Sequence, residues 1–187
     1  MEPTNAPILV LINGISGAGK DTFVEAMPIP CANMHRSDPF KEYLKSIGWD
    51  GARDEKSRTI LKYLVDIGEE SGYNEAELCN RLLKLEMNNI DTSQPNILFY
   101  HVRDINTIDK IKHSSKVWDI AKDVVSLLIY RDSVEPTEPN EWYDVNSYKK
   151  KYDYVVYNND TIERLKNKSI VFYKILVREV ESVDGEI

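Results

Sequence analysis

The stretch Gly14-Ile15-Ser16-Gly17-Ala18-Gly19-Lys20-Asp21-Thr22 decides the fold, because it follows an apolar run and precedes a helical pattern. It fits the spacing G-x-x-x-x-G-K, in which glycines let the backbone wrap so that successive N–H groups point inward. A loop of this kind at the start of a helix binds phosphate oxygens. The residues that we predict to bind phosphate are Gly14, Ser16, Gly17, Ala18, Gly19, Lys20, Asp21 and Thr22.

Three side chains at the end of this loop have the chemistry that a bound triphosphate requires. Lys20 supplies a point charge for the β- and γ-phosphates. Asp21 stands where Ser or Thr is usual, and its carboxylate is a hard oxygen ligand for Mg²⁺. The same carboxylate could instead simply favour the helix N-terminus, and both roles could hold together. Thr22 would then offer its hydroxyl to the α- or β-phosphate.

The rest of the chain alternates between strand and helix patterns. The apolar run 7–12 predicts a strand buried on both faces of a parallel sheet. Further strands are expected at 31–35, 97–100, 124–130 and 154–157, and helices at 20–27, 37–47, 55–67, 75–87, 105–111 and from 161 onward. This order predicts a three-layer α/β fold around a mainly parallel sheet. We expect a single domain over residues 1–187, with a lid-like loop at 132–146.

Two arginines directly follow predicted strands. Ligands of such sheets lie beyond the carboxyl ends of the strands. We therefore expect Gly14, Arg103 and Arg131 to line one edge of the sheet. Each arginine also has a plainer interpretation, since Arg103 could pair with Asp104 and Arg131 could be solvated beside Asp132.

Composition restricts the class of protein. The chain has 187 residues, of which 42% are hydrophobic and 29% charged, as in globular proteins. Its net charge of −7 argues against a duplex nucleic-acid partner but allows a small phosphate-bearing substrate. Cys31 and Cys79 have no metal or redox spacing, which indicates a reducing compartment. Because we find no signal peptide and the run 8–12 is too short to cross a membrane, we expect a cytoplasmic protein.

From Gly19-Lys20-Asp21-Thr22 onward the sequence resembles the phage-type deoxynucleoside monophosphate kinases. The segments that carry the resemblance are Ser37-Asp38-Pro39-Phe40-Lys41-Glu42, Gly48-Trp49-Asp50-Gly51-Ala52-Arg53-Asp54, Arg58, Val102-Arg103 with Asn106, Tyr130-Arg131, and Asp153-Tyr154-Val155-Val156 followed by Asn158-Asn159. Their order and spacing extend over most of the chain. No later segment is specific alone, and their succession is more persuasive than the phosphate loop by itself.

The resemblance implies that the γ-phosphoryl group of ATP is transferred to a (deoxy)nucleoside 5′-monophosphate, with Mg²⁺. That reaction needs cations around the transferring group rather than a covalent nucleophile. The candidate catalytic cations are Lys20, Arg103, which could hold the acceptor phosphate, and Arg131, which could close over ATP. The residues expected to bind the acceptor are Asp38, Lys41, Trp49, Arg53, Arg58 and Arg103.

Two positions depart from the family pattern. His101 stands where an Asp is expected two residues before the arginine, and Thr107 stands where Glu is usual. Because a neutral histidine cannot replace a carboxylate near Mg²⁺ without cost, Asp21 and Asp38 would have to hold the metal and its waters, or catalysis is weakened. Two alternatives therefore stay open: a P-loop kinase for another small acceptor, and a catalytically silent nucleotide-binding regulatory protein.

Other patterns are less informative. His35, His101 and His113 form no metal-binding spacing with either cysteine, so we predict no metal site from them. The leucines of 75–87 have helical spacing that fits the core or, less well, a dimer interface. A homodimer is thus left open.

Overall fold

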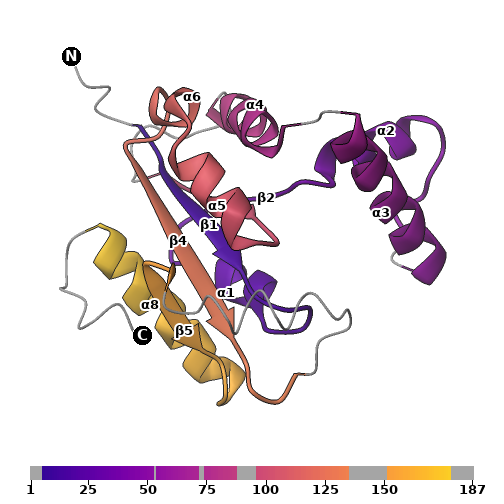
Figure 1. Ribbon diagram of the computed structural model, residues 1–187. Coiled ribbons are helices and arrows are strands. Elements are labelled where there is room, and N and C mark those ends of the chain that lie inside the picture. The colour runs from indigo at the N-terminus through magenta and orange to yellow at the C-terminus, as the bar shows by residue number, and fades with distance from the viewer. Residues whose placement is uncertain (1–5, 53, 72–73, 88–95, 135–150, 178–187) are drawn as a thin grey trace.

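The computed structural model describes residues 6–52, 54–71, 74–87, 96–134 and 151–177 (Figure 1). A five-stranded sheet lies at the centre, in the order β2-β3-β1-β4-β5. The strands are β1 (Ile8–Asn13), β2 (Ala32–His35), β3 (Ile97–His101), β4 (Asp123–Tyr130) and β5 (Tyr154–Tyr157). Each neighbouring pair runs parallel. This arrangement confirms the predicted α/β fold with a parallel sheet.

Helices flank the sheet and join its strands. They are α1 (Lys20–Glu25), α2 (Asp38–Ser46), α3 (Glu55–Glu70), α4 (Glu75–Met87), α5 (Ile105–Lys112), α6 (Ser115–Trp118) and α8 (Ile162–Leu176). Helix α1 packs against α8, and α4 packs against α5 and α6. Figure 1 shows α2 and α3 together at one side of the molecule, beyond β2. None of the helices within the described ranges is long and apolar enough to cross a bilayer.

The core is built around β1, whose six residues are all buried. Strand β1 is central in the sheet, and the flanking helices cover both faces of the sheet, which is why its sequence is an unbroken apolar run. The ring of Phe23 on α1 lies 5.7 Å from that of Phe172 on α8. The hydroxyl of Ser169 also donates to the carbonyl oxygen of Phe23 at 2.7 Å. These contacts attach the helix that follows the phosphate loop to the C-terminal helix.

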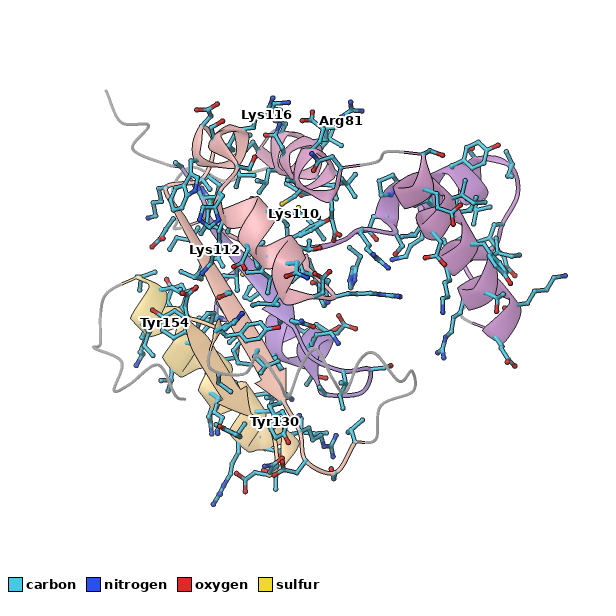
Figure 2. All side chains as sticks on the ribbon, viewed as in Figure 1. Arg81, Lys110, Lys112, Lys116, Tyr130 and Tyr154 are labelled. Atoms are coloured by element: carbon cyan, nitrogen blue, oxygen red, sulfur yellow. The ribbon has the colours of Figure 1, made fainter. Side chains whose placement is uncertain are left out.

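Helices α4 and α6 are joined through polar contacts at the surface. At the top of Figure 2, Lys116 of α6 and Arg81 of α4 lie close together. Both pair with Glu77 of α4: Lys116 Nζ lies 2.6 Å from its Oε2, and Arg81 Nε lies 3.7 Å from its Oε1. Leu78 and Leu83 of α4 are buried, as a core role predicts, whereas Leu85 is exposed.

The elements lie close to their predicted positions, with one difference. The four-residue helix α6 was not predicted, because one turn is too short to show a helical period.

Thr107, at the position where the resembled family has Glu, completes the N-terminus of α5. It donates its backbone N–H and its hydroxyl to Asp104, at 2.9 and 2.7 Å. Of the predicted lid at 132–146, residues 135–146 lie outside the described residues, and the single-domain assignment stays a prediction.

Candidate functional site

The phosphate loop connects the end of β1 to the start of α1, as its spacing predicts. Gly19 has a φ of 101°, in the left-handed region, and a Cβ there would lie 2.6 Å from Nδ2 of Asn158. At Gly14 a Cβ would lie 2.4 Å from the carbonyl oxygen of Ile129 on β4. Both positions thus require glycine, because a strand backbone approaches Gly14 closely and the Asn158 side chain approaches Gly19, which also has a left-handed backbone.

Lys20 folds back over the loop that it follows. Its Nζ donates to the carbonyl oxygens of Gly14, at 2.5 Å, and of Ile15, at 3.0 Å. The ammonium group therefore lies against the loop itself, where a bound phosphate would be held. A lysine at this place supplies positive charge to the terminal phosphates of a nucleotide.

Asn158, directly after β5, holds the loop from behind. Its Nδ2 donates to the carbonyl oxygen of Ala18 at 2.8 Å, and its backbone N–H donates to the carbonyl oxygen of Tyr130 at 2.7 Å. The side chain is buried, so this amide replaces the water that would otherwise satisfy Ala18. Sequence reasoning noted Asn158 only within the family resemblance and assigned it no role.

Asn13, the last residue of β1, connects the loop to two other segments. Its Oδ1 accepts from the backbone N–H of Gly14 at 2.6 Å. Its Nδ2 donates to the carbonyl oxygen of Arg103 at 3.1 Å and to the hydroxyl of Tyr152 at 2.7 Å. Asn13 was also missed, although a buried asparagine at the end of an apolar strand is itself a signal.

Arg103 follows the end of β3, and the hydrogen bond from Asn13 to its carbonyl oxygen brings it to the loop. Its side chain is exposed, and the Asp104 carboxylate is engaged by Thr107. The backbone of Arg103 therefore lies at the carboxyl edge of the sheet, beside Asn13, and its side chain is exposed there. This is where the sequence predicted a ligand-binding arginine.

Arg131 follows β4 on the other side of the loop. Its Nε donates to the hydroxyl of Ser133 at 3.1 Å, and the neighbouring carboxylate of Asp132 accepts from Asn159. Val134, three residues on, lies 3.5 Å from the point where a Cβ on Gly17 would be. The turn that begins at Arg131 thus passes beside the tip of the phosphate loop.

The residues predicted to bind the acceptor fall into two groups. Asp38 and Lys41 lie at the start of α2, where Asp38 accepts from Lys41 Nζ at 2.7 Å and from the backbone N–H of His35 at 2.6 Å. Trp49 and Arg58 belong to the α2–α3 part, with Trp49 Nε1 donating to Ser57 at 3.2 Å and Arg58 exposed on α3. Arg53 lies outside the described residues. The first group adjoins the end of β2, and the second lies farther from the sheet (Figure 1).

Two histidines meet beside Asp21, at the ends of β2 and β3. His35 and His101 are partners in the register of the two strands, and their rings stack with centroids 3.9 Å apart. The Nε2 atoms of His35 and His101 lie 3.9 and 3.7 Å from the same oxygen of Asp21. This cluster corrects the expectation that the histidines belong to no metal-binding group, because that expectation considered spacing along the chain only.

Asn33 completes the cluster. Its Oδ1 lies 2.7 Å from Nε2 of His101, and its Nδ2 donates to Asp21 at 3.3 Å. Burial lowers the pKa of His101, and the nearby charges of His35 and Lys20 lower it further. Burial also lowers the pKa of His35, although the charge of Asp38 opposes the shift. Both imidazoles are therefore neutral at pH 7, and the Nε2 of His101 carries the proton that the Asn33 oxygen accepts.

The cluster fits Mg²⁺ only in part. The exposed carboxylate of Asp21 is an oxygen ligand of the kind that Mg²⁺ binds, as predicted. The imidazoles of His35 and His101 that face it are not, because Mg²⁺ prefers oxygen and keeps most of its waters.

No protein-family model and no curated protein sequence matches the chain. Among solved structures, the chain is similar to a mutant of the Mycobacterium tuberculosis APS kinase CysC, with 12% identity, coverage of 91% of this chain and 99% of that one, and a TM-score of 0.48. It is also similar to an unliganded sugar kinase from a Janibacter species, with 12% identity, coverage of 95% and 99%, and a TM-score of 0.44.

Proposed function

We propose that this chain is an ATP-dependent phosphotransferase whose acceptor is a nucleoside or deoxynucleoside 5′-monophosphate. The observation that carries the proposal is the phosphate loop between β1 and α1. There, the Ile129 backbone leaves no room for a side chain at Gly14, the Asn158 side chain leaves none at Gly19, and Lys20 lies against the loop carbonyl groups. A loop built in this way binds the phosphates of a nucleotide.

The cations around the loop provide the electrostatic stabilisation that phosphoryl transfer needs. Lys20 would hold the terminal phosphates of ATP, and Arg131, in the turn beside Gly17, would approach them from the other side. Arg103 would bind the acceptor phosphate with its forked guanidinium. Since a phosphate acceptor is already an anionic nucleophile, positioning and charge suffice and no general base is required.

The class of acceptor rests on the sequence resemblance, together with the position of the residues that carry it. Asp38 and Lys41 are paired at the start of α2, next to the end of β2. Trp49 and Arg58 lie on the part formed by α2 and α3, where we propose that they contact the base and the phosphate of the monophosphate. We propose Arg53 as a further phosphate contact. Asp21 would hold the divalent cation that reduces the charge repulsion between the two nucleotides.

The experiment that tests this function is an ATP-consumption assay of the purified chain with Mg²⁺. A panel of ribo- and deoxynucleoside monophosphates serves as acceptors, and APS and simple sugars serve as controls. Turnover with one or a few monophosphates would support the proposal and identify the substrate. Turnover with a control acceptor alone would assign a P-loop kinase of another specificity.

One observation favours a second candidate function, a catalytically silent nucleotide-binding protein. His101 places an imidazole where the resembled family has a carboxylate, within 3.7 Å of the oxygen expected to hold Mg²⁺. Such a protein would bind ATP tightly and transfer phosphate to no acceptor. In that case His101→Asp is the variant to assay next, because it restores the family residue.

A further inference from the structure

We infer that Asp21, His35 and His101 bind a divalent transition-metal ion of the class of Zn²⁺ and Co²⁺, at the ends of β2 and β3. This goes beyond the proposed function, because the ion would bind to the protein without a nucleotide. It does not depend on the chain being a kinase.

The fold brings the three donors together from distant parts of the sequence. The parallel pairing of β2 with β3 sets His35 opposite His101, and α1 presents Asp21 to both. Each residue offers one ligand atom, and these atoms all lie within 4.8 Å of one another. Within the described residues, this is the one group of three or more His, Cys, Asp or Glu side chains with such geometry.

The distances are close to those of a metal site. With metal–nitrogen bonds of about 2.0 to 2.1 Å, the donors of a tetrahedral ion lie about 3.4 Å apart. The Nε2 atoms of His101 and His35 are 3.7 and 3.9 Å from Asp21 Oδ1. All donor atoms lie within 4.8 Å of one another, so the side chains would have to rotate, and the stacked imidazoles to move apart, for the three donors to share one ion.

The donor set selects the class of metal. Two imidazole nitrogens and one carboxylate suit Zn²⁺, Co²⁺ and Ni²⁺ rather than Mg²⁺ or Ca²⁺. The amide oxygen of Asn33 lies 2.7 Å from His101 Nε2 and accepts its proton in the metal-free chain. A bound ion would take the place of that proton, with the His101 proton moving to Nδ1, and the freed amide oxygen could become a further ligand.

The surroundings leave one side of the cluster open. The side chain of His101 is 10% exposed, that of His35 is 32% exposed and that of Asp21 is 63% exposed. Three protein donors with an exposed side are typical of metal sites that keep a position for water or substrate. Two lysines are near enough to oppose a cation: the charge of Lys41 is balanced by Asp38, whereas Lys20 keeps its charge and donates to the loop carbonyl groups.

The test is metal binding by the nucleotide-free, full-length chain. Zn²⁺ is titrated by calorimetry, and Co²⁺ is followed by the visible d–d absorption that low-coordinate nitrogen and oxygen ligation produces. We expect one equivalent to bind with a micromolar or tighter dissociation constant. Asp21→Asn, His35→Ala and His101→Ala should each weaken binding by at least about tenfold.

His113 provides the matched control, because it is the third histidine of the chain and lies at the end of α5. Its Nδ1 is bonded to the backbone carbonyl of Asp109, and its side chain is exposed. His113→Ala should bind as the unmodified chain does. Circular dichroism verifies that each variant is folded. If His101→Ala, which changes the most buried of the three residues, does not fold, the variants of exposed Asp21 and half-buried His35 decide the result. Binding no tighter than millimolar would overturn the inference. So would binding that survives in Asp21→Asn and His35→Ala, whether or not His113→Ala loses it.

Discussion

Asn158 and Ala18 are 140 residues apart in the sequence, and the side-chain amide of Asn158 donates a 2.8 Å hydrogen bond to the carbonyl oxygen of Ala18. The same Nδ2 atom occupies the space that a side chain on Gly19 would need. The shape of the phosphate loop therefore depends on a residue at the end of the last strand.

Asn158→Ala tests that dependence. The variant leaves the buried carbonyl of Ala18 without its protein donor, which should cost about 1 to 3 kcal/mol in the free energy of unfolding. ATP binding should weaken as well, because the loop loses its support. Urea denaturation and calorimetry measure the two effects. Asn167→Ala, at an exposed position of α8, is the control, and equal effects in both variants would contradict the role of Asn158.

Gly19→Ala and Gly48→Ala separate backbone strain from collision. Both glycines have a φ just above 100°, but a Cβ on Gly48 meets nothing within 4 Å, whereas one on Gly19 meets Asn158. Gly48→Ala should lose only about 1 to 2 kcal/mol of stability, the usual cost of a left-handed alanine. Gly19→Ala should lose more and should no longer bind ATP. Similar stability losses in the two variants would show that the contact with Asn158 is easily relieved.

Lys20→Ala should abolish turnover while leaving the fold intact. The ammonium group of the lysine donates to carbonyl oxygens of the loop, so its removal takes away positive charge at the place where the phosphates would bind. We expect the rate to fall by at least about a hundredfold, as when a main electrostatic donor is removed. Lys166→Ala, exposed on α8, is the matched control. Activity close to that of the unmodified chain in Lys20→Ala would refute the assignment.

Arg103→Lys and Arg131→Lys should affect different substrates. A lysine cannot grip a phosphate with two parallel hydrogen bonds, so Arg103→Lys should raise KM for the monophosphate by about 10- to 100-fold. KM for ATP should change little in this variant. Arg131→Lys should instead lower kcat or raise KM for ATP. The opposite assignment of the two effects would exchange the roles of the two arginines.

Asp153 should make stability depend on pH in the acid range. Burial raises the pKa of its carboxyl, but hydrogen bonds from Lys112 and Ser126 outweigh that effect and lower the pKa overall. A carboxyl with a lowered pKa stabilises the fold above its ordinary pKa, and this stabilisation is lost as the pH falls below it. Asp153→Asn should therefore be less stable at pH 7 and show a shallower loss of stability below about pH 5.

Urea denaturation at several pH values measures this dependence. The Asp153 carboxylate accepts two hydrogen bonds from Ser126, one from its hydroxyl at 2.8 Å and one from its backbone N–H at 2.6 Å. Asp119→Asn, at an exposed position after α6, controls for the change in net charge. An Asp153→Asn profile parallel to that of the unmodified chain would exclude the carboxylate as the source.

The sheet and the phosphate loop were predictable because their signals are local. Strand β1 is covered on both faces, so every residue in it is apolar up to Asn13, and the glycine spacing directly follows. Strand β4 is readable for the same reason, with six consecutive buried residues. Both patterns arise within a few residues of the chain, where spacing alone carries the information.

The histidine cluster was not predictable, because it depends on the order of the strands. The predicted strands at 31–35 and 97–100 already brought a histidine to each strand end. Nothing in the local sequence states that β2 and β3 are neighbours, and only that adjacency sets His35 against His101. The buried amides of Asn13 and Asn158 escaped for a related reason, since their partners are defined only after folding.

The bond from Asn158 to Ala18 also orders events in time. A ribosome synthesises the loop about 140 residues before the asparagine that supports it. At about 5 to 20 residues per second, this leaves an interval of roughly 7 to 30 seconds in which the nascent loop lacks its support. The support that Asn158 gives to the nucleotide site therefore forms only after β5 has been synthesised.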